Sequence, residues 1–183
     1  MLDQMGQRLH LCRTFEDSVR RILVDVVALH GAEFGNVQMP VGDRLVIVDQ
    51  LGLDAAFLSA FREVRSADGC ACGRALREGR AVVVADVEAD KAYVPFRAAA
   101  KRAGYRSAQS TPMLTSGGTV VGVVSTLFAN AYAPTQIEMT TLSRYCRLAA
   151  ERLLLLLDGQ ELSRKALELH KELYSGVGVS PVS

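Results

Sequence analysis

The chain contains no tryptophan, and aromatic residues make up only 6% of its 183 residues. Its core must therefore consist mainly of Leu, Val and Ala side chains. The formal net charge is +1, so the chain has no excess of positive charge with which to bind nucleic-acid phosphates. Apolar runs such as Leu153–Leu157 are too short to cross a bilayer. The length and the 49% hydrophobic content fit one folded domain with some additional helix.

Cysteine and histidine are also scarce, with four and three residues respectively. Four thiols in a chain of this length do not make a disulfide framework. The first residues do not combine a basic start, an apolar run and a small-residue cleavage site, which predicts a cytoplasmic location and free thiols. A zinc site needs about four Cys or His ligands, whereas His10, His30 and His170 fall in the terminal helices or tail. We therefore expect no metal site, no nucleic-acid partner and no membrane contact.

The pattern of residues 15–30 predicts a helix. Thr14 and Asp17 resemble a capping box, apolar residues recur at helical spacing, and Gly31 stands where a helix would end. Residues 1–13 are then an N-terminal extension.

Residues 32–131 alternate predicted strands and short helices. The strands are expected at residues 32–41, 45–50, 82–84, 106–114 and 120–128. The short helices are expected near Phe57–Phe61, over 72–78 and over 96–103. Because tight turns join antiparallel neighbours, the pattern predicts an α+β domain with an antiparallel sheet and helices on its faces.

The last part of the chain is predicted to be helical. Thr135 and Glu138 form a capping box at its start. Leucines then repeat at intervals of seven and predict a seam with a second subunit; they are Leu148, Leu155, Leu162 and Leu169. The Asp158-Gly159 pair could break this rod into two helices. Residues 175–183 contain Gly, Ser and Pro and are predicted to be a disordered tail.

The segment Gly69–Val87 is the most informative part of the chain. Cys70 and Cys72 lie at the start of a short predicted helix, and a short apolar strand ends at Asp86. Such polar groups either line a pocket or serve as small filling residues and a turn cap. The residues alone leave both interpretations open.

Five segments of the chain resemble parts of a GAF domain, the small-molecule sensor module of bacterial signalling proteins. They are Gly35–Gln38, Gly73–Leu76, Val84–Val87, Gln109–Met113 and Val121–Ser125. The resemblance covers about residues 14–157 and implies a six-stranded antiparallel sheet. It also implies N- and C-terminal helices on one face, pairing between subunits, and short helices and loops that roof a ligand pocket on the other face.

The resemblance places the pocket under residues 69–105 and implies which residues form its walls. The implied ligand-binding residues are Cys70, Cys72, Asp86, Tyr93, Phe96, Tyr105, Gln109 and Thr126. Each type also has a structural interpretation. Asp86 could cap the following turn, the aromatic side chains could pack the roof onto the sheet, and Gln109 could make an internal hydrogen bond.

Cys72 is the candidate for redox chemistry, because a thiol at a helix N-terminus has a lowered pKa. The Cys72-Gly73 turn resembles that of the free methionine sulfoxide reductases, which are GAF-like enzymes. Those enzymes need a further cysteine after the third strand, and this chain has none between Asp86 and Ser107. A disulfide between Cys70 and Cys72 would be strained, and no cysteine is followed by the histidine of bilin-binding relatives. Small buried filler remains the alternative for both thiols.

We therefore expect a non-catalytic regulatory domain that binds an unidentified small molecule. It would form a homodimer through its terminal helices and pass a signal to a partner protein. The expected division is an extension (1–13), a GAF-like domain (14–157), a helical extension (158–174) and a disordered tail (175–183). Two alternatives stay open: a thiol-based redox sensor or degenerate reductase, and a ligand-free dimerisation module whose pocket is filled with side chains.

Overall fold

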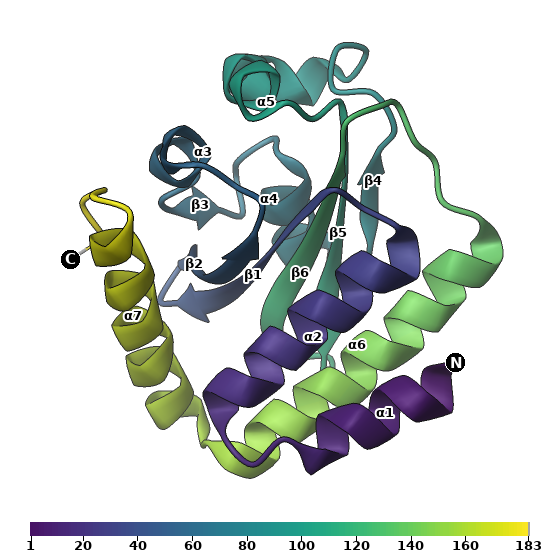
Figure 1. The fold of residues 1–183 in the computed structure, drawn as a ribbon, viewed down its shortest axis with the longest axis vertical. Helices are drawn as coiled ribbons and strands as arrows, with labels where there is room; N and C mark the ends of the chain where they lie inside the picture. Colours follow the sequence, from purple (N-terminus) through teal and green to yellow (C-terminus); the bar gives the residue numbers. More distant parts are fainter. Residues whose placement is uncertain (183) are drawn as a thin grey trace.

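The computed structural model describes residues 1–182, which form a six-stranded sheet with helices on both faces (Figure 1). The helices are α1 (Leu2–Leu11), α2 (Phe15–His30), α3 (Ala55–Ala60), α4 (Ala71–Glu78), the 3₁₀ helix η1 (Lys91–Phe96), α5 (Arg97–Ala103), α6 (Gln136–Leu156) and α7 (Gly159–Gly176). The strands are β1 (Phe34–Val41), β2 (Arg44–Leu51), β3 (Val64–Arg65), β4 (Val82–Val84), β5 (Ser107–Leu114) and β6 (Val120–Phe128). None of the helices in residues 1–182 is long and apolar enough to span a membrane.

The sheet is antiparallel, with the strand order β3-β2-β1-β6-β5-β4. Glycines at positive φ, Gly42 and Gly118, lie in the turns of the β1–β2 and β5–β6 hairpins. The α+β class and the antiparallel sheet are therefore confirmed. Strand β3 was not predicted, because two residues are too few to show an alternating pattern.

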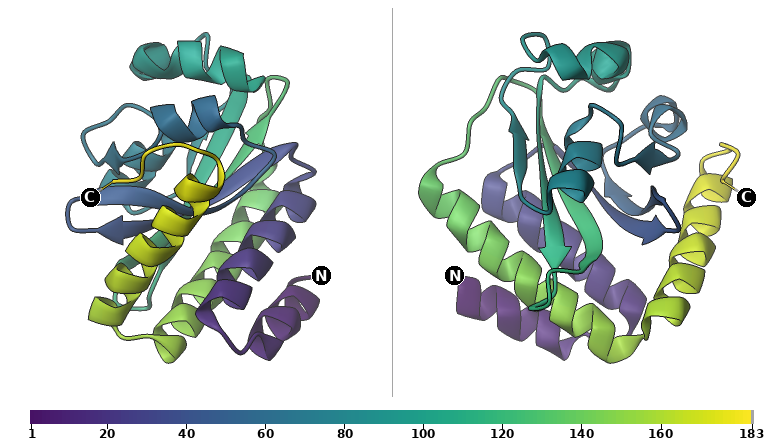
Figure 2. Two further views of the ribbon diagram at one scale, coloured as in Figure 1. Left: turned by 60° about the vertical axis from the view of Figure 1, so that its left-hand side comes forward. Right: turned by 180° about the vertical axis from the view of Figure 1, so that it is seen from behind.

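Helices α2 and α6 cover one face of the sheet (Figure 2). The apolar stripe of α2 is buried there, with Ile22 and Leu23 inaccessible to solvent, and it packs in one cluster with Val37 and Met39 of β1. Thr14 caps α2 by accepting a hydrogen bond from the backbone N–H of Asp17. The predicted helix of residues 15–30 therefore forms with the predicted cap, and its stripe determines which side faces the sheet.

Helix α1 packs across α2 and α6, although the sequence pattern left residues 1–13 as an extension. Its side chains Met5 and Leu9 are buried. The carboxylate of Asp25, buried in α2, accepts hydrogen bonds from Arg8 of α1 and from the Tyr145 hydroxyl of α6, each at 2.9 Å. A buried carboxylate is tolerated only when it is partnered, so this group joins three helices at one point.

Shorter elements cover the opposite face of the sheet: α3, α4, η1 and α5 (Figure 1). They enclose a second apolar cluster that includes Leu45 and Ile47 of β2, Phe57 and Leu58 of α3, and Val123 of β6. Asp90 caps η1 by accepting hydrogen bonds from two backbone N–H groups. Because η1 and α5 lie over the open end of this face, we call residues 91–103 the roof.

The C-terminal helix does not continue as one rod. Asp158 forms a capping box with Glu161 and begins α7, so the break considered at Asp158-Gly159 is present. Helix α7 then runs back beside β2 (Figures 1 and 2). Strand β3 pairs only with Arg44 and Leu45, and α7 packs beside the rest of β2, a common way of protecting an edge strand.

The prediction of a disordered tail over residues 175–183 is wrong for the residues that the structure describes. Helix α7 extends to Gly176, and Val182 is only 4% exposed. His170 explains the return of the chain: its Nδ1 lies 2.8 Å from the Ile47 carbonyl oxygen, and its Nε2 accepts the Val182 N–H at 3.1 Å. Because a carbonyl only accepts and an N–H only donates, the ring is neutral with its proton on Nδ1. Ser183, the end of the predicted tail, lies outside the described residues.

Candidate functional site

The floor of the candidate pocket is a polar strip across the middle of the sheet. Asn36 of β1 is paired with Ser125 of β6, which is paired with Ser110 of β5. Their side chains point toward the roof, and the two serine hydroxyls share a hydrogen bond of 2.7 Å. Gln38, two residues after Asn36, faces the same side. Four buried polar groups thus interrupt an otherwise apolar surface.

Aromatic side chains form the walls and the underside of the roof. Phe57 and Phe61 stack with centroids 4.4 Å apart. Tyr93 of η1 lies over the floor, and its hydroxyl is hydrogen-bonded to that of Tyr105 at 3.0 Å. Burial raises the pKa of both tyrosines well above the usual value, so both hydroxyls are neutral donors and acceptors.

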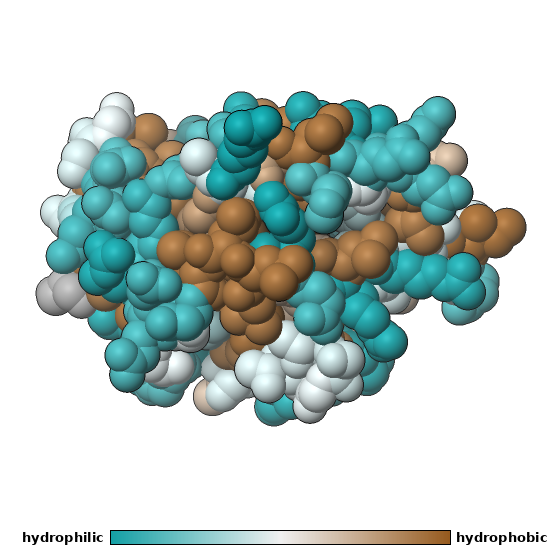
Figure 3. All heavy atoms as spheres, turned by 90° about the horizontal axis from the view of Figure 1, so that it is seen from below, coloured by the Kyte–Doolittle hydropathy of each residue, from teal (hydrophilic) through white to brown (hydrophobic). Residues whose placement is uncertain are grey.

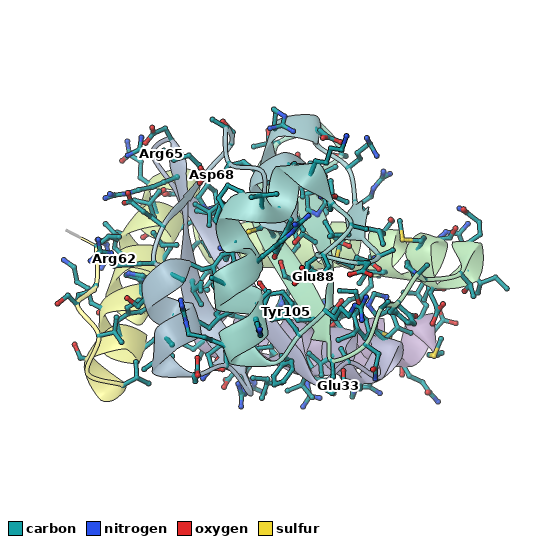
Figure 4. The ribbon with its side chains drawn as sticks, turned by 90° about the horizontal axis from the view of Figure 1, so that it is seen from above. Glu33, Arg62, Arg65, Asp68, Glu88 and Tyr105 are labelled. Carbon is teal, nitrogen blue, oxygen red and sulfur yellow. The ribbon has the colours of Figure 1, made fainter. Side chains whose placement is uncertain are left out.

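Charged residues hold the roof down from outside. Arg74 of α4 pairs with Asp90 at 3.0 Å, and the Arg97 guanidinium donates to the carbonyls of Val87 and Asp90. Seen from above, Tyr105 lies near the middle of the molecule, whereas Arg62 and Arg65 lie toward its edge (Figure 4). The roof is therefore fastened by polar contacts at its margin and by aromatic packing within.

The space between floor and roof is small. Its volume is about 10 Å³, close to the minimum that a single water molecule needs. It is lined by Asn36, Gln38, Phe57, Phe61, Ala71, Cys72, Tyr93, Ala108, Ser110, Ser125 and Leu127. Within the described chain, Asn36 Oδ1 and Gln38 Oε1 are buried without a hydrogen-bond partner. The site is a nearly filled pocket that keeps two unused acceptors.

Cys70 and Cys72 lie together beside this space, with their sulfur atoms 3.5 Å apart. Cys72 lines the cavity, and Cys70 is the N-cap of α4. A hydrogen bond from the Cys72 thiol, together with one from the backbone of Gly73, lowers the pKa of Cys70. The same contact with Cys70, together with burial, raises the pKa of Cys72. The contact between the two sulfur atoms thus shifts their pKa values in opposite directions, whereas the helix start was expected to lower the pKa of Cys72.

Asp86 does not line the cavity. Its side chain is partly exposed, forms an ion pair with Arg106 at 2.8 Å, and accepts the backbone N–H of Glu88. The Arg106 contact, followed by that N–H, lowers the pKa of Asp86. The structure corresponds to the turn-capping interpretation, because the chain turns away from the sheet directly after β4.

Gln109 and Thr126 lie on the wrong side of the sheet for the predicted pocket. They are paired across β5 and β6 in the row next to that of Ser110 and Ser125, and successive rows face opposite sides. Thr126 instead contacts His30 Nδ1 of α2 at 3.0 Å. The expectation that these two residues form pocket walls is corrected by the register.

The remaining predicted residues lie at or behind the roof. Tyr93 lines the cavity, while Tyr105 stands behind it through their shared hydrogen bond. Phe96 is half-buried on the outer side and contacts Phe61 and Tyr93, with centroid distances of 5.4 and 5.8 Å. The aromatic residues therefore build and hold the roof, and Tyr93 is the one that reaches the cavity.

Sequence reasoning missed the polar floor. Asn36 and Gln38 alternate with Val37 and Met39 in β1, and two amides at the strand period were a usable signal. It also missed Gly69, where an added Cβ would overlap the backbone carbonyl of Ala92 in η1. Glycine at this position lets the segment before α4 lie directly against the roof.

The predicted seam leucines separate into two groups. In α6, Leu148 is 48% and Leu155 is 76% exposed, and with Leu11 of α1 they line an apolar groove. Figure 3 shows an apolar area on the lower face, toward which α1 and the end of α6 lie. Leu162 is buried and Leu169 partly buried in the same chain, because α7 folds back onto the domain.

The fold and the roofed sheet define an α+β domain with long helices on one face of the sheet and a covered cavity on the other. A family model for the GAF domain matches residues 12–153, and the chain belongs to the GAF domain family.

Several solved structures share this fold. The GAF domain of a phosphoenolpyruvate-protein phosphotransferase from Coxiella burnetii is 15% identical, with a TM-score of 0.72, covering 84% of this chain and 90% of that one. The corresponding domain from Acinetobacter is 12% identical, with a TM-score of 0.70 and the same coverage. A free methionine-R-sulfoxide reductase from Neisseria meningitidis, solved with its substrate, is 20% identical, with a TM-score of 0.63, covering 90% and 89%. No curated protein matches the sequence.

Proposed function

We propose that this GAF domain is a non-catalytic regulatory module that binds a small molecule between the sheet and the roof. The proposal is carried by Asn36 and Gln38, which line the cavity and whose buried amide oxygens have no partner in the described part of the chain. Leaving such a group unpaired costs about 1–3 kcal/mol. Apolar side chains of similar shape would fill the same space without that cost, so the amides are best explained by a ligand that pairs with them.

Ligand entry requires the roof to move, because the present space is about 10 Å³. The contacts that must give way include the Arg74–Asp90 ion pair, the Arg97 hydrogen bonds, the Tyr93–Tyr105 hydrogen bond and the stacking of Phe61 on Phe96. The floor strands β1, β5 and β6 carry α2 and α6 on their other face. A ligand that rearranges the floor therefore acts on those helices through the sheet.

We further propose that a second copy of the chain covers the apolar groove of α1 and α6. Leu11, Leu148 and Leu155 project there from two helices and leave an apolar surface open to solvent. Apolar surface rimmed by polar residues is a common feature of contacts between protein chains. In such a homodimer, α6 would link the pocket floor to the subunit contact, and a signalling partner would respond to a change there.

We also propose that the domain catalyses no reaction. The neighbour from Neisseria meningitidis is a reductase, but here no cysteine lies between Asp86 and Ser107 to serve as a second redox partner in the roof segment. A thiol-sensor function remains the weaker alternative. It would use Cys70 and Cys72, which touch each other but are both buried beneath the closed roof.

The test of ligand binding exchanges the two amides for apolar side chains of similar shape. In the Asn36→Leu/Gln38→Met double variant, we expect the apo protein to keep or gain thermal stability, because two unpaired groups are removed. The stabilisation by any ligand found in a thermal-shift screen should disappear. Gln109→Met is the matched control, since Gln109 also has a buried unpaired Oε1 but faces the helices. A double variant that unfolds well below the wild type would refute the functional interpretation of the amides.

The small cavity volume favours a second candidate, a dimerisation module that takes no ligand. In that case the wild type would show no ligand response in the screen, and the Leu155→Lys variant would lose dimerisation as its only functional defect. Native mass spectrometry of the purified protein separates the two candidates, because it reports subunit number and bound small molecules in one measurement.

A further inference from the structure

We infer that the ligand of this cavity is an uncharged, planar molecule with at least two N–H or O–H donors. The inference rests on the ligand-binding function proposed above and names the class of molecule that this particular lining accepts. It is drawn from three properties of the site: the charge of the lining, the unpaired acceptors and the flat aromatic walls.

Charge is the first property. All eleven residues that line the cavity are uncharged. The charged groups that hold the roof lie outside this lining: Arg74 pairs with Asp90 at 3.0 Å, and Arg97 donates to the carbonyls of Val87 and Asp90. A carboxylate or phosphate moved onto this floor would be buried without a counter-charge, which is strongly unfavourable. The lining therefore selects against anionic and cationic ligands.

The unpaired acceptors are the second property. Asn36 and Gln38 line the cavity from alternate positions of β1, and their oxygens Oδ1 and Oε1 have no partner in the described chain. Their backbones lie roughly 6–7 Å apart along the strand. The Gln38 side chain also acts on the Cys72 thiol, whose pKa it lowers against the larger opposing effects of Cys70 and burial. The hydroxyl groups of Ser110 and Ser125 are hydrogen-bonded to each other, with their oxygen atoms 2.7 Å apart. A ligand bound on this floor would therefore pair with it through hydrogen-bond donors rather than through acceptors.

The aromatic walls are the third property. Phe57 and Phe61 are stacked 4.4 Å apart, and Phe57 meets Tyr105 edge-on at 5.9 Å. Tyr93 of the roof also lines the cavity. A flat ring that enters as the roof lifts gains contact with these faces, whereas a bulky saturated molecule would have to separate them further. Together, the three properties describe a heteroaromatic or aromatic amide.

The experiment compares two pairs of probes that share a ring and differ in charge. Nicotinamide is matched with nicotinate, and uracil with orotate. Each is titrated into the full chain labelled with ¹⁵N, and the side-chain amide signals of Asn36 and Gln38, assigned from Asn36→Leu and Gln38→Met, are followed by NMR. We expect the neutral probes to shift these signals and to bind at least about tenfold more tightly than the carboxylates. Removing one acceptor should weaken the neutral probes by about threefold to tenfold, while Gln109→Met should bind like the wild type.

The outcomes separate the inference from the proposed function. If nicotinate or orotate shifts the two amide signals as strongly as its neutral partner, the ligand class is refuted and the ligand-binding pocket stands. If no probe of either charge moves the signals, both the ligand class and the proposed pocket function are refuted. If the neutral probes bind equally well to Asn36→Leu and Gln38→Met, the donor argument is refuted although binding is present.

Discussion

The C-terminal helix is expected to depend on His170, and His170→Phe tests this most directly. Phenylalanine keeps the ring that packs on Tyr174, with centroids 4.1 Å apart. It removes the hydrogen bonds to the Ile47 carbonyl and from the Val182 N–H. The carbonyl stays buried under α7 and costs about 1–3 kcal/mol. The Val182 N–H is also buried, so leaving it without an acceptor costs a further amount of about 1–3 kcal/mol.

The sum predicts a loss of about 2–6 kcal/mol, or roughly 4–24 °C in melting temperature for a chain of this length. Urea unfolding followed by circular dichroism measures it. His10→Gln is the control, because His10 is exposed on α1 and should change stability by less than about 0.5 kcal/mol. A loss below about 0.5 kcal/mol for His170→Phe would show that the two hydrogen bonds do not hold α7 in place.

The same residue predicts a pH dependence. Burial, followed by the nearby charges of Arg44, Arg62 and Lys171, lowers the pKa of His170 from its usual 6.5, against an opposing contribution from the Ile47 carbonyl. Because the folded state prefers the neutral ring, the stabilisation is fully present above pH 6.5 and is lost as the pH falls below it. The difference between wild type and His170→Phe should therefore shrink from pH 7.5 to pH 5. His30, whose pKa is also lowered by burial, is present in both proteins and cancels.

Three further predictions concern the roof, the groove and the thiols. Gly69→Ala should destabilise the domain by about 1–3 kcal/mol in a urea titration, because the new Cβ would push on the Ala92 carbonyl. Gly117→Ala is the control and should leave the stability unchanged, since its Cβ would meet one side-chain atom at 3.7 Å. Leu155→Lys should abolish the proposed dimer in analytical ultracentrifugation, whereas Ile137→Lys, 78% exposed at the other end of α6, should leave it intact. In a ¹³Cβ NMR titration, Cys70 should deprotonate at a lower pH than Cys72, and the reverse order would contradict the hydrogen-bond direction inferred for this pair.

Local patterns in the sequence were sufficient for most of the secondary structure. Examples are the apolar stripe of α2, the Thr135–Glu138 capping box and the two hairpin turns. Each of these features is formed by residues that are close to one another in the sequence. Such contacts are visible in sequence because propensity, capping and turn chemistry act over short distances. Helix α1 was not predicted from the sequence. Its position is determined by contacts with the Asp25–Tyr145 pair, and both of these residues are far from α1 in the sequence.

The candidate site was predicted less well, for a reason of geometry. A strand places successive side chains on opposite faces, so Gln109 and Ser110 are neighbours in sequence but belong to different sides of the sheet. Strand register alone decides which of them meets the pocket. Asp86 was a reasonable candidate by type, yet its ion pair with Arg106 depends on where β5 begins relative to β4.

By itself, the sequence determined the α+β class, the family, the main helices and strands and the absence of a long apolar span, because each follows from composition or short-range pattern. Only the tertiary structure decided that the pocket is almost filled, that Asn36 and Gln38 belong to its polar floor, and that the sulfur atoms of Cys70 and Cys72 are in contact. It also decided that α7 returns to the sheet edge through His170 instead of extending as a rod. These features depend on distances between residues far apart in the chain, and those distances exist only once the sheet has formed.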